Sequence, residues 1–148
     1  MRLGHPSCEP SGVIERSNPA GLHTPPGYHH VTVADATRTA FLAGQCPLDE
    51  QGRLVGPGDL LAQVDQVIGN IGVALTSVGA GADDVVRTVV YVASADRDDL
   101  AAVWVRLRES DLSAAFSSAS TLLGVSQLGF PGQLVEIDVT AALRGSDR

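Results

Sequence analysis

Lysine is absent from this 148-residue sequence, so arginine supplies all ten of its basic side chains. Those arginines are dispersed along the chain, and only Arg106 and Arg108 lie close together. Because Asp and Glu total 17, the formal net charge at pH 7 is -7. A nucleic-acid binder normally needs a clustered basic face that displaces counterions from phosphates. The composition therefore argues against a nucleic-acid partner.

Cysteine is scarce as well, since the chain has only Cys8 and Cys46. These two make neither a disulfide framework nor a metal-ligand spacing, and they fit a reduced, cytoplasmic setting. Cys46 has no neighbour in the sequence that would stabilise a thiolate, so we interpret it as structural.

Long apolar runs and catalytic signatures are also lacking. No run approaches the ~18 apolar residues that span a bilayer, and residues 1–17 have no apolar core of the signal-peptide type, so we expect no membrane partner and no export. The chain has no Gly-rich phosphate loop, His-Glu-x-x-His, nucleophile elbow or Cys-x-x-Cys. His29 and His30 are adjacent, and adjacent strand residues point to opposite faces, so we expect no metal site.

What the sequence does contain is an ordinary globular composition, with 44% hydrophobic and 18% charged residues. Its length favours one domain. Pro, Gly and Ser concentrate in residues 1–12, which we interpret as a loose N-terminal arm. A single domain over residues 13–143 and a C-terminal tail over residues 144–148 follow.

Short β-prone runs between turn residues predict an edge strand and five further strands. The edge strand covers residues 13–16, and the others cover residues 30–34, 37–42, 85–92, 120–125 and 134–142. Asp35 and Ala36 fit a hairpin link between the first two of these five. The last two strands are predicted to form a final pair, joined through residues 129–132.

Two amphipathic helices complete the pattern. Asp59 occupies the N-cap position of the first, whose apolar residues recur at three- and four-residue steps until Gly79 ends it. Gly69 and Gly72 inside this helix would allow it to approach a sheet closely. The second helix begins within residues 96–99.

The element order, apart from the edge strand, is β-β-α-β-α-β-β. It indicates an α/β (α+β) fold in which a mixed sheet carries both helices on one face. The other face then needs a cover, and a homo-oligomer is the simplest one.

Few polar residues stand in suggestive places. Glu136 lies between two apolar residues of a strand and shares its face with Asp138. It is either a solvated or ion-paired residue at a sheet edge, which periodicity alone favours, or a group suited to acid–base chemistry. Tyr28 follows a Pro-Pro-Gly turn and either lines a pocket or packs on a loop. Trp104 lies on the apolar face of the second helix, where core packing is the ordinary explanation.

Several short phrases in register, from about residue 17 to 143, together resemble the Rid (reactive intermediate deaminase, YjgF-like) superfamily. They are Asn18-Pro19 with Gly21-Leu22, Gly27-Tyr28-His29-His30, Ala43-Gly44-Gln45-Cys46-Pro47, Leu54-Val55-Gly56 with Gly58-Asp59, Ala62-Gln63 with Gln66, Asn70-Ile71, Asp84-Val85-Val86-Arg87, Tyr91-Val92 and Leu134-Val135-Glu136-Ile137-Asp138. The resemblance implies a chorismate-mutase-like fold and a homotrimer with ligand clefts between subunits. It also implies hydrolysis of enamines and imines made by pyridoxal-phosphate enzymes, which releases a keto acid and ammonia without any metal or organic cofactor.

The family's site residues carry over position by position. Its cleft-lining Tyr matches Tyr28, and its water-positioning Glu matches Glu136. Its Ser-Gly-Gln segment falls on residues 43–45, so the Ser is lost here. Its Pro-Ala-Arg-Ser phrase falls on residues 118–121, which puts Ser120 where the family has the Arg that clamps the substrate carboxylate. The resemblance thus implies Glu136 as the catalytic residue and Tyr28, Ala43, Gly44, Ser120 and Thr121 as substrate-binding residues. We add Trp104 to this substrate-binding set as a prediction of our own.

The missing arginine is the most informative feature. No Arg occurs between Arg108 and Arg144, so a slip of the match by a residue or two changes nothing. Losing a charged hydrogen-bond partner of a carboxylate typically costs about 2–5 kcal/mol, so we expect a poor 2-iminoacid deaminase. A neutral cleft lined by Ser and Thr suits an uncharged or aromatic small-molecule ligand better.

Two functions remain open. The first is cofactor-free hydrolysis or tautomerisation of an imine, enamine or related carbonyl compound by Glu136. The second is a non-catalytic ligand-binding or regulatory trimer that has kept the cleft and lost the chemistry. Older labels for relatives include translation inhibitor and endoribonuclease, but the acidic charge of this chain disfavours both.

Overall fold

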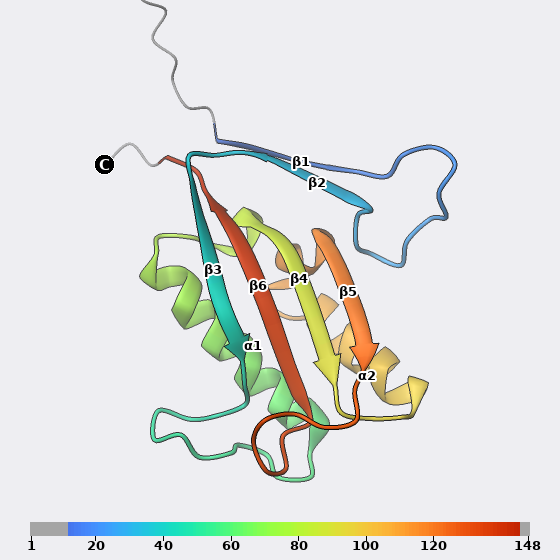
Figure 1. Cartoon of the computed structure of the whole chain (residues 1–148), viewed down its shortest axis with the longest axis vertical. Coiled ribbons are helices and arrows are strands. Elements are labelled where there is room, and N and C mark those ends of the chain that lie inside the picture. The colour runs from blue at the N-terminus through green and yellow to red at the C-terminus, as the bar shows by residue number, and fades with distance from the viewer. Residues whose placement is uncertain (1–11, 146–148) are drawn as a thin grey trace, which may run out of the picture.

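The computed structural model describes residues 12–145 and has one main sheet with both helices on one face (Figure 1). The main sheet has the strand order β3-β6-β4-β5, and a separate two-stranded sheet pairs β1 with β2. The strands are β1 (Val13–Ser17), β2 (Val31–Asp35), β3 (Arg38–Gln45), β4 (Val85–Val92), β5 (Ala119–Gly124) and β6 (Val135–Leu143). The helices are α1 (Leu60–Ser77) and α2 (Arg97–Arg108), with short 3₁₀ helices η1 (Ala82–Asp84) and η2 (Ser113–Ser117). The predicted mixed sheet with two helices on one face is confirmed.

Two of the predicted strand pairings are wrong. Strands β2 and β3 do not form a hairpin, because β2 pairs antiparallel with β1, and β3 pairs antiparallel with β6. Strands β5 and β6 are not neighbours either, because β4 lies between them, parallel to β5 and antiparallel to β6. Helix α2 supplies the crossover connection that the parallel pair β4–β5 requires.

Helix α1 has the predicted ends. The Asp59 carboxylate accepts a hydrogen bond from the backbone N–H of Ala62 at 3.1 Å, which makes Asp59 the N-cap. Gly79 follows the helix with φ of 73°, a left-handed conformation that favours glycine. The expected close approach through Gly69 and Gly72 is wrong, because a Cβ added at either position would meet nothing within 4 Å.

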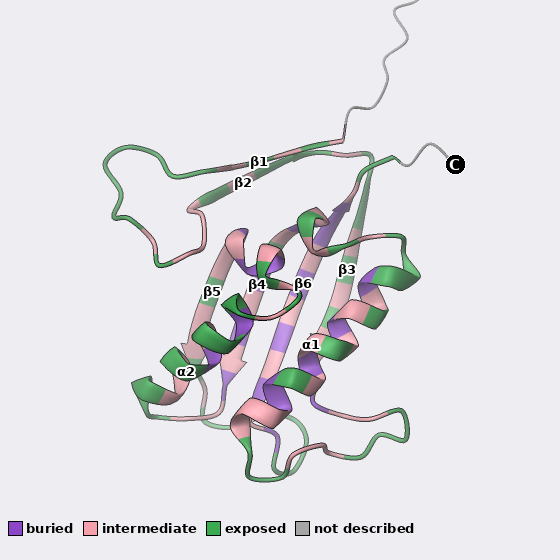
Figure 2. Ribbon diagram, turned by 180° about the vertical axis from the view of Figure 1, so that it is seen from behind, coloured by how far each residue is buried: buried purple, intermediate pink, exposed green. Residues whose placement is uncertain are grey.

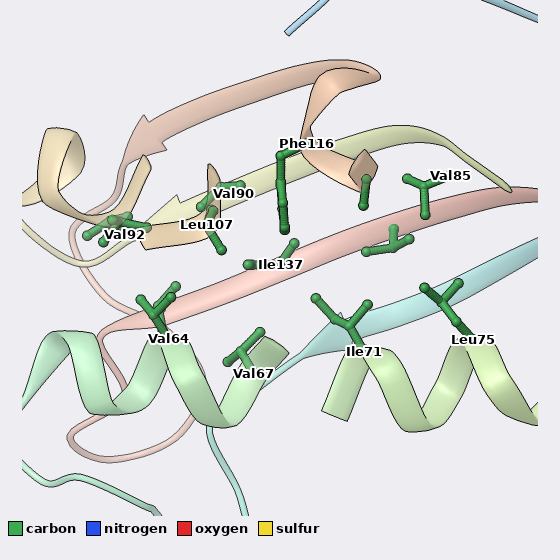
Figure 3. Packing of buried hydrophobic residues seen from close by; sticks show 14 of the residues in the cluster. Val64, Val67, Ile71, Leu75, Val85, Val90, Val92, Leu107, Phe116 and Ile137 are labelled. Carbon is green, nitrogen blue, oxygen red and sulfur yellow. The ribbon is translucent and has the colours of Figure 1, made fainter. Parts of the chain in front are cut away.

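The hydrophobic core fills the layer between the two helices and the sheet (Figure 3). Its fully buried side chains include Val64, Val67, Ile71, Leu75, Val90, Val92, Val103, Leu107, Phe116 and Ile137. Each such side chain contributes about 1.5–3 kcal/mol by leaving water. Within residues 12–145, no helix combines the length and the hydropathy that a membrane crossing requires.

Over residues 12–145, the other side of the main sheet, which we call the open face, carries no helix (Figures 1 and 2). Side chains alternate along β6, so Val135, Ile137 and Val139 are buried toward the helices, whereas Glu136 and Asp138 belong to the open face. The residues of the open face that matter below are Phe41, Arg87, Tyr91, Thr121, Glu136 and Asp138. Phe41 is 80% exposed there, so the open face offers apolar surface as well as carboxylates.

The two-stranded sheet lies across one end of the main sheet (Figure 1). A guanidinium nitrogen of Arg16 on β1 donates to the Val85 carbonyl oxygen at 3.0 Å. The backbone N–H of Ala119 donates to the Thr32 hydroxyl of β2 at 2.9 Å. These bonds attach β1 and β2 to the first residues of β4 and β5.

The predicted arm and tail fall largely outside the described residues. Of residues 1–12 only Gly12 is described, and Cys8 lies outside, as do residues 146–148 of the tail. Arg144, the first tail residue, forms an ion pair with Asp84, with 2.7 Å between Nε and Oδ1.

Candidate functional site

Glu136 and Asp138 converge on the backbone of Gly44. A Cβ added to Gly44 would lie 2.6 Å from Oε2 of Glu136 and 3.0 Å from Oδ1 of Asp138, so a side chain at that position would displace the Glu136 carboxylate. Gly44 reaches this place because the pairing of β3 with β6 is irregular between Leu42 and Gln45. The interpretation of Glu136 as an edge residue is wrong, since β6 has β3 on one side and β4 on the other.

Two side chains donate hydrogen bonds to the same oxygen of Glu136. The Cys46 thiol lies 3.0 Å from Oε1, and the Gln133 amide nitrogen lies 3.2 Å from it. Burial, followed by the hydrogen bond and the charge of Glu136, raises the pKa of Cys46 from 9.0 to about 12. The thiol therefore stays protonated at neutral pH and acts as a donor. We call Gly44, Cys46, Gln133, Glu136 and Asp138 the carboxylate site.

Tyr91 extends the carboxylate site along β4. It is the register partner of Glu136, and its hydroxyl donates to Oδ2 of Asp138 at 3.0 Å. This hydrogen bond raises the pKa of Tyr91 above its usual value, with smaller contributions from burial and from the charges of Asp138 and Glu136. The two carboxylates therefore differ in their hydrogen-bond donors. Glu136 accepts from a thiol and an amide, whereas Asp138 accepts from a phenol.

Amides of α1 hold the segments that carry the carboxylate site. The Asn70 side chain donates to the Cys46 and Leu48 carbonyl oxygens, at 2.9 Å each. The Gln63 side chain, fully buried, donates to the Gly132 carbonyl oxygen at 3.1 Å and accepts from the Leu134 backbone N–H at 2.8 Å. Helix α1 thus fixes both the loop after β3 and the loop before β6.

A groove of about 920 Å³ adjoins the carboxylate site at the edge of the sheet. It runs between helix α1 and the loop that follows β3, and Gly44, Cys46, Asn70, Val73 and Phe130 are among its lining residues. The groove gives a small molecule access to the neighbourhood of Gly44 from the side of β3.

A second, smaller pocket of about 90 Å³ lies beside the edge strand β5. We call it the aromatic pocket, and its lining residues are Pro26, Tyr28, Trp104, Ser120 and Leu122. The rings of Tyr28 and Trp104 stand edge to face with centroids 6.4 Å apart. The Trp104 indole N–H donates to the Pro26 carbonyl oxygen at 2.9 Å, so α2 anchors the loop that carries Tyr28.

The predicted site residues fall into two groups within one chain. Tyr28, Trp104 and Ser120 meet in the aromatic pocket, which lies on the helix side of β5. Gly44 and Glu136 meet at the carboxylate site, and Ala43 is exposed just before Gly44 on β3. The last predicted residue, Thr121, points to the open face, because Ser120 pairs with the buried Thr88 on the other face. One chain alone does not bring the two groups together.

Among the described residues, Arg87 places a guanidinium on the open face. Arg87 donates to the Thr121 hydroxyl at 2.8 Å. It pairs with Thr140, four residues along β4 from Tyr91, which places it about 13 Å from the level of Glu136. The open face is therefore not neutral throughout, and its positive charge sits away from the carboxylate site.

Two other arginines are held elsewhere. Arg106 forms an ion pair with Asp65 of α1, at 2.6 Å, which holds the pKa of Asp65 below its usual value. Arg108 donates to the Pro26 carbonyl oxygen at 3.2 Å, at the rim of the aromatic pocket. The Arg106 guanidinium is thus engaged on the helix side of the sheet.

His29 and His30 form hydrogen bonds with backbone carbonyl oxygens. A ring nitrogen of His29 bonds to the Ser117 carbonyl oxygen, and one of His30 bonds to the His23 carbonyl oxygen at 2.7 Å. Over residues 12–145, no group of three or more His, Cys, Asp and Glu side chains is placed to hold a metal ion.

Sequence reasoning missed Cys46, Gln133 and Tyr91 as parts of the site. The alternation of β6 placed Asp138 beside Glu136 correctly. Nothing local marks Cys46, however, because its partner Glu136 lies 90 residues further along the chain. Only the pairing of β3 with β6 brings them together.

Comparison with known proteins classifies the chain. The sequence model of the family described as Endoribonuclease L-PSP matches residues 22–143. A RutC family protein of Synechocystis is 34% identical over 120 residues, which cover 80% of this chain and 88% of that protein. The solved structure of YyfB from Yersinia pestis, a conserved Rid family protein of unknown function, is 34% identical and has a TM-score of 0.78, covering 88% of this chain and 98% of its own. A YjgF family member from Neisseria meningitidis, 23% identical with a TM-score of 0.57, covers 92% of this chain and 99% of its own and shares the fold. These matches, together with the α+β fold, show that the chain belongs to the Rid (YjgF-like) superfamily.

Proposed function

We propose that the protein is a cofactor-free hydrolase or tautomerase of a neutral imine, enamine or related carbonyl compound, with Glu136 as its catalytic residue. The supporting observation is the state of the Glu136 carboxylate. In the described part of the chain, both side-chain hydrogen bonds to Glu136 go to Oε1, from Cys46 and Gln133. Oε2 lies beside the backbone of Gly44 and accepts none of these bonds, so it is the oxygen left to accept from a substrate or a water molecule. A fixed carboxylate with one open oxygen suits general acid–base catalysis.

The chemistry balances without a cofactor. For an imine, Glu136 takes a proton from a water molecule as the water oxygen bonds to the C=N carbon, and it passes this proton on to the nitrogen. The proton of the new hydroxyl group later follows the same route to the nitrogen, so that the leaving group is ammonia. The resulting carbinolamine then loses ammonia, and its hydroxyl becomes the carbonyl group. For an enamine, Glu136 first takes a proton from the nitrogen and delivers one to the β-carbon, which gives the imine. Each step uses one carboxylate and water.

The substrate cleft forms between subunits of a homotrimer. The aromatic pocket lies beside edge strand β5, and the carboxylate site lies near edge strand β3, at opposite edges and on opposite faces of the sheet. A cyclic assembly in which the β5 edge of one subunit meets the β3 edge of the next would join the two groups. The same assembly would cover Phe41, which is 80% exposed on the open face.

The cleft selects an uncharged substrate. At the position matched to the family's arginine, the Ser120 hydroxyl accepts from Thr88 at 2.6 Å and donates to the Ser118 carbonyl oxygen at 3.1 Å. A substrate carboxylate there would lack the bidentate partner that a guanidinium supplies. Tyr28 and Trp104 offer ring surface instead, which suits an aromatic or apolar substituent.

A non-catalytic ligand-binding trimer is the second candidate. The hydrogen bonds of Ser120 with Thr88 and Ser118 favour this candidate, because they occupy the hydroxyl group at the position matched to the family's arginine, so that it cannot readily bind a reacting substrate. Both candidates share the fold, the assembly and the cleft. They differ only in whether Glu136 moves a proton.

Imine trapping distinguishes the two candidates. An amine oxidase produces neutral imines in solution, and semicarbazide converts whatever imine remains into a chromophore. We expect the wild-type protein to slow semicarbazone formation and Glu136→Gln to lose at least about 100-fold of this activity, the usual weight of a general base. Glu109→Gln, which changes an exposed carboxylate next to α2, serves as the matched control and should stay active. If the wild-type trimer does not slow semicarbazone formation from any imine, ligand binding remains as its function.

A further inference from the structure

We propose that Cys46 and Gln133 are positioning residues that hold Glu136 in one conformation and thereby reserve Oε2 for the reacting atoms. This inference rests on the proposed function, in which Glu136 transfers protons. Neither residue touches the substrate in this account. Both act through the carboxylate.

The two donors reach Oε1 from different segments. Cys46 lies in the loop after β3, with its thiol 3.0 Å from Oε1. Gln133 lies in the loop before β6, with its amide nitrogen 3.2 Å from Oε1. Fixing a glutamate side chain in one rotamer costs about 1.5–2 kcal/mol of conformational entropy. A carboxylate held by a single hydrogen bond would therefore sample several positions. The hydrogen bonds from Cys46 and Gln133 to Oε1 together restrict the rotation of the carboxylate, and this restriction also fixes the position of Oε2.

Each donor is itself held in place. Gln133 is 4% exposed, its side-chain oxygen accepts from the Phe130 backbone N–H at 3.1 Å, and its amide also donates to the Val135 carbonyl oxygen at 3.0 Å. The Cys46 carbonyl oxygen accepts from the Asn70 amide at 2.9 Å. The donors therefore form a rigid support rather than two mobile side chains.

Gly44 borders the other carboxylate oxygen of Glu136, Oε2. A Cβ at this position would come within 2.6 Å of Oε2 and 2.8 Å of the carboxylate carbon of Glu136, closer than side-chain atoms approach. At Gly44, Oε2 therefore faces backbone that carries no side chain. The reactive oxygen is thus confined between a peptide surface and the space in front of the open face.

The thiol suits this role because it stays protonated. Burial and Glu136 raise the pKa of Cys46 to about 12, so almost no thiolate exists at neutral pH. A thiolate would be a nucleophile and would repel the carboxylate, whereas a thiol donates a hydrogen bond to it. At neutral pH, Cys46 therefore acts as a hydrogen-bond donor to Glu136.

Kinetics test the role of the thiol in a Cys8→Ser background, where Cys46 is the only cysteine. We expect Cys46→Ala to lower kcat about 10-fold or more with KM changed by less than about twofold, because the loss affects orientation rather than binding. Cys46→Ser keeps a donor of similar shape and should retain kcat within about threefold. A Cys46→Ala protein with wild-type kcat would overturn the proposal. Substitutions at Gln133 would also disturb the fold, because its side chain is buried, so the test uses variants of Cys46.

Alkylation gives a readout that does not depend on turnover. In the same background, Glu136→Gln removes the hydrogen bond and the charge of Glu136, which raise the pKa of Cys46, while burial, the largest cause, remains. Iodoacetamide should then react several-fold faster at mildly alkaline pH, because a lower pKa increases the thiolate fraction. Asp138→Asn, which removes a neighbouring carboxylate that does not contact the thiol, is the control and should leave the rate within about twofold. Equal rates in wild type and Glu136→Gln would show that the thiol does not hold Glu136.

The two readouts separate the positioning role from the proposed function. If the wild type hydrolyses no imine while Glu136→Gln still accelerates alkylation, the proposed function fails and the support of Glu136 stands. If the wild type is active while neither kcat nor alkylation responds to these substitutions, the positioning role fails and the proposed function stands.

Discussion

Ser120 and Glu136 lie on opposite faces of one sheet, with strand β4 between them. Ser120 pairs with Thr88, which is fully buried on the helix side, whereas Glu136 pairs with Tyr91 on the open face. The position matched to the family's arginine and the candidate catalytic carboxylate therefore cannot share a substrate within one chain. A site that uses both needs a second copy.

The first prediction concerns assembly. Size exclusion with light scattering should give about three times the 15.3 kDa chain mass at micromolar concentration, because the open face needs a cover. Phe41→Glu should dissociate the assembly, since it places a charge on that face. Val105→Glu, at a 53% exposed position of α2, is the matched control. A wild-type protein with the mass of one chain would refute the shared cleft.

The second prediction restores a carboxylate partner. Ser120→Arg should raise the hydrolysis of 2-imino acids by at least about 30-fold, which corresponds to the lower end of the energy of a buried charged pair. Ser126→Arg adds the same charge at an exposed position and should change nothing. If the trimeric Ser120→Arg protein gains no such activity, residue 120 does not face the substrate carboxylate.

The third prediction concerns the backbone beneath Glu136. Gly44→Ala should lower kcat about 100-fold, because its Cβ would displace a carboxylate oxygen that lies 2.6 Å away. The measurement is the imine-trapping rate, with circular dichroism to check that the variant is folded. An active Gly44→Ala protein would mean that the carboxylate moves freely and that its position is not critical.

A glycine in helix α1 should behave in the opposite way. Gly69 is exposed, and a Cβ there meets nothing within 4 Å. Gly69→Ala should therefore raise the free energy of unfolding by about 1 kcal/mol, the difference in helix propensity. Urea unfolding measures this change. A destabilised Gly69→Ala protein would point to a covering partner at this helix face.

The fifth prediction follows from the Cys46 thiol. Its pKa rises from 9.0 to about 12 on folding, so the native state binds the proton more tightly than the unfolded chain. This contribution to stability is complete below pH 9.0 and is lost as the pH rises toward about 12. In the Cys8→Ser background, the wild-type residue should therefore lose more stability across that window than Cys46→Ser. Parallel pH profiles of the urea midpoint for the two proteins would contradict the raised pKa.

Local signals in the sequence were enough for the elements. Asp59 and Gly79 bound α1 because an N-cap carboxylate and a left-handed glycine act within one helical turn. The run of residues 85–92 forms β4 because β-branched side chains fit a buried strand. In each case the deciding interactions join residues close in the chain.

Strand partners and site contacts could not be derived in this way. The pairing of β3 with β6 joins residues about a hundred positions apart, and no turn between them sets the register. The thiol of Cys46 and the carboxylate of Glu136 meet only through that pairing. From the sequence alone, Cys46 is therefore interpreted as structural. The short links between neighbouring strands predict hairpins, but the strands pair with partners further along the chain or on a different sheet.

The most direct test compares two substrates of the same wild-type protein by semicarbazide trapping. An amine oxidase supplies a neutral imine with an aromatic substituent, and an amino-acid oxidase supplies the 2-imino acid with the same substituent. Because residue 120 is a serine and not an arginine, the protein should hydrolyse the neutral imine at least about 30-fold more efficiently than the 2-imino acid. Faster hydrolysis of the 2-imino acid would contradict the account, because it would require a carboxylate partner such as Arg87 in the cleft.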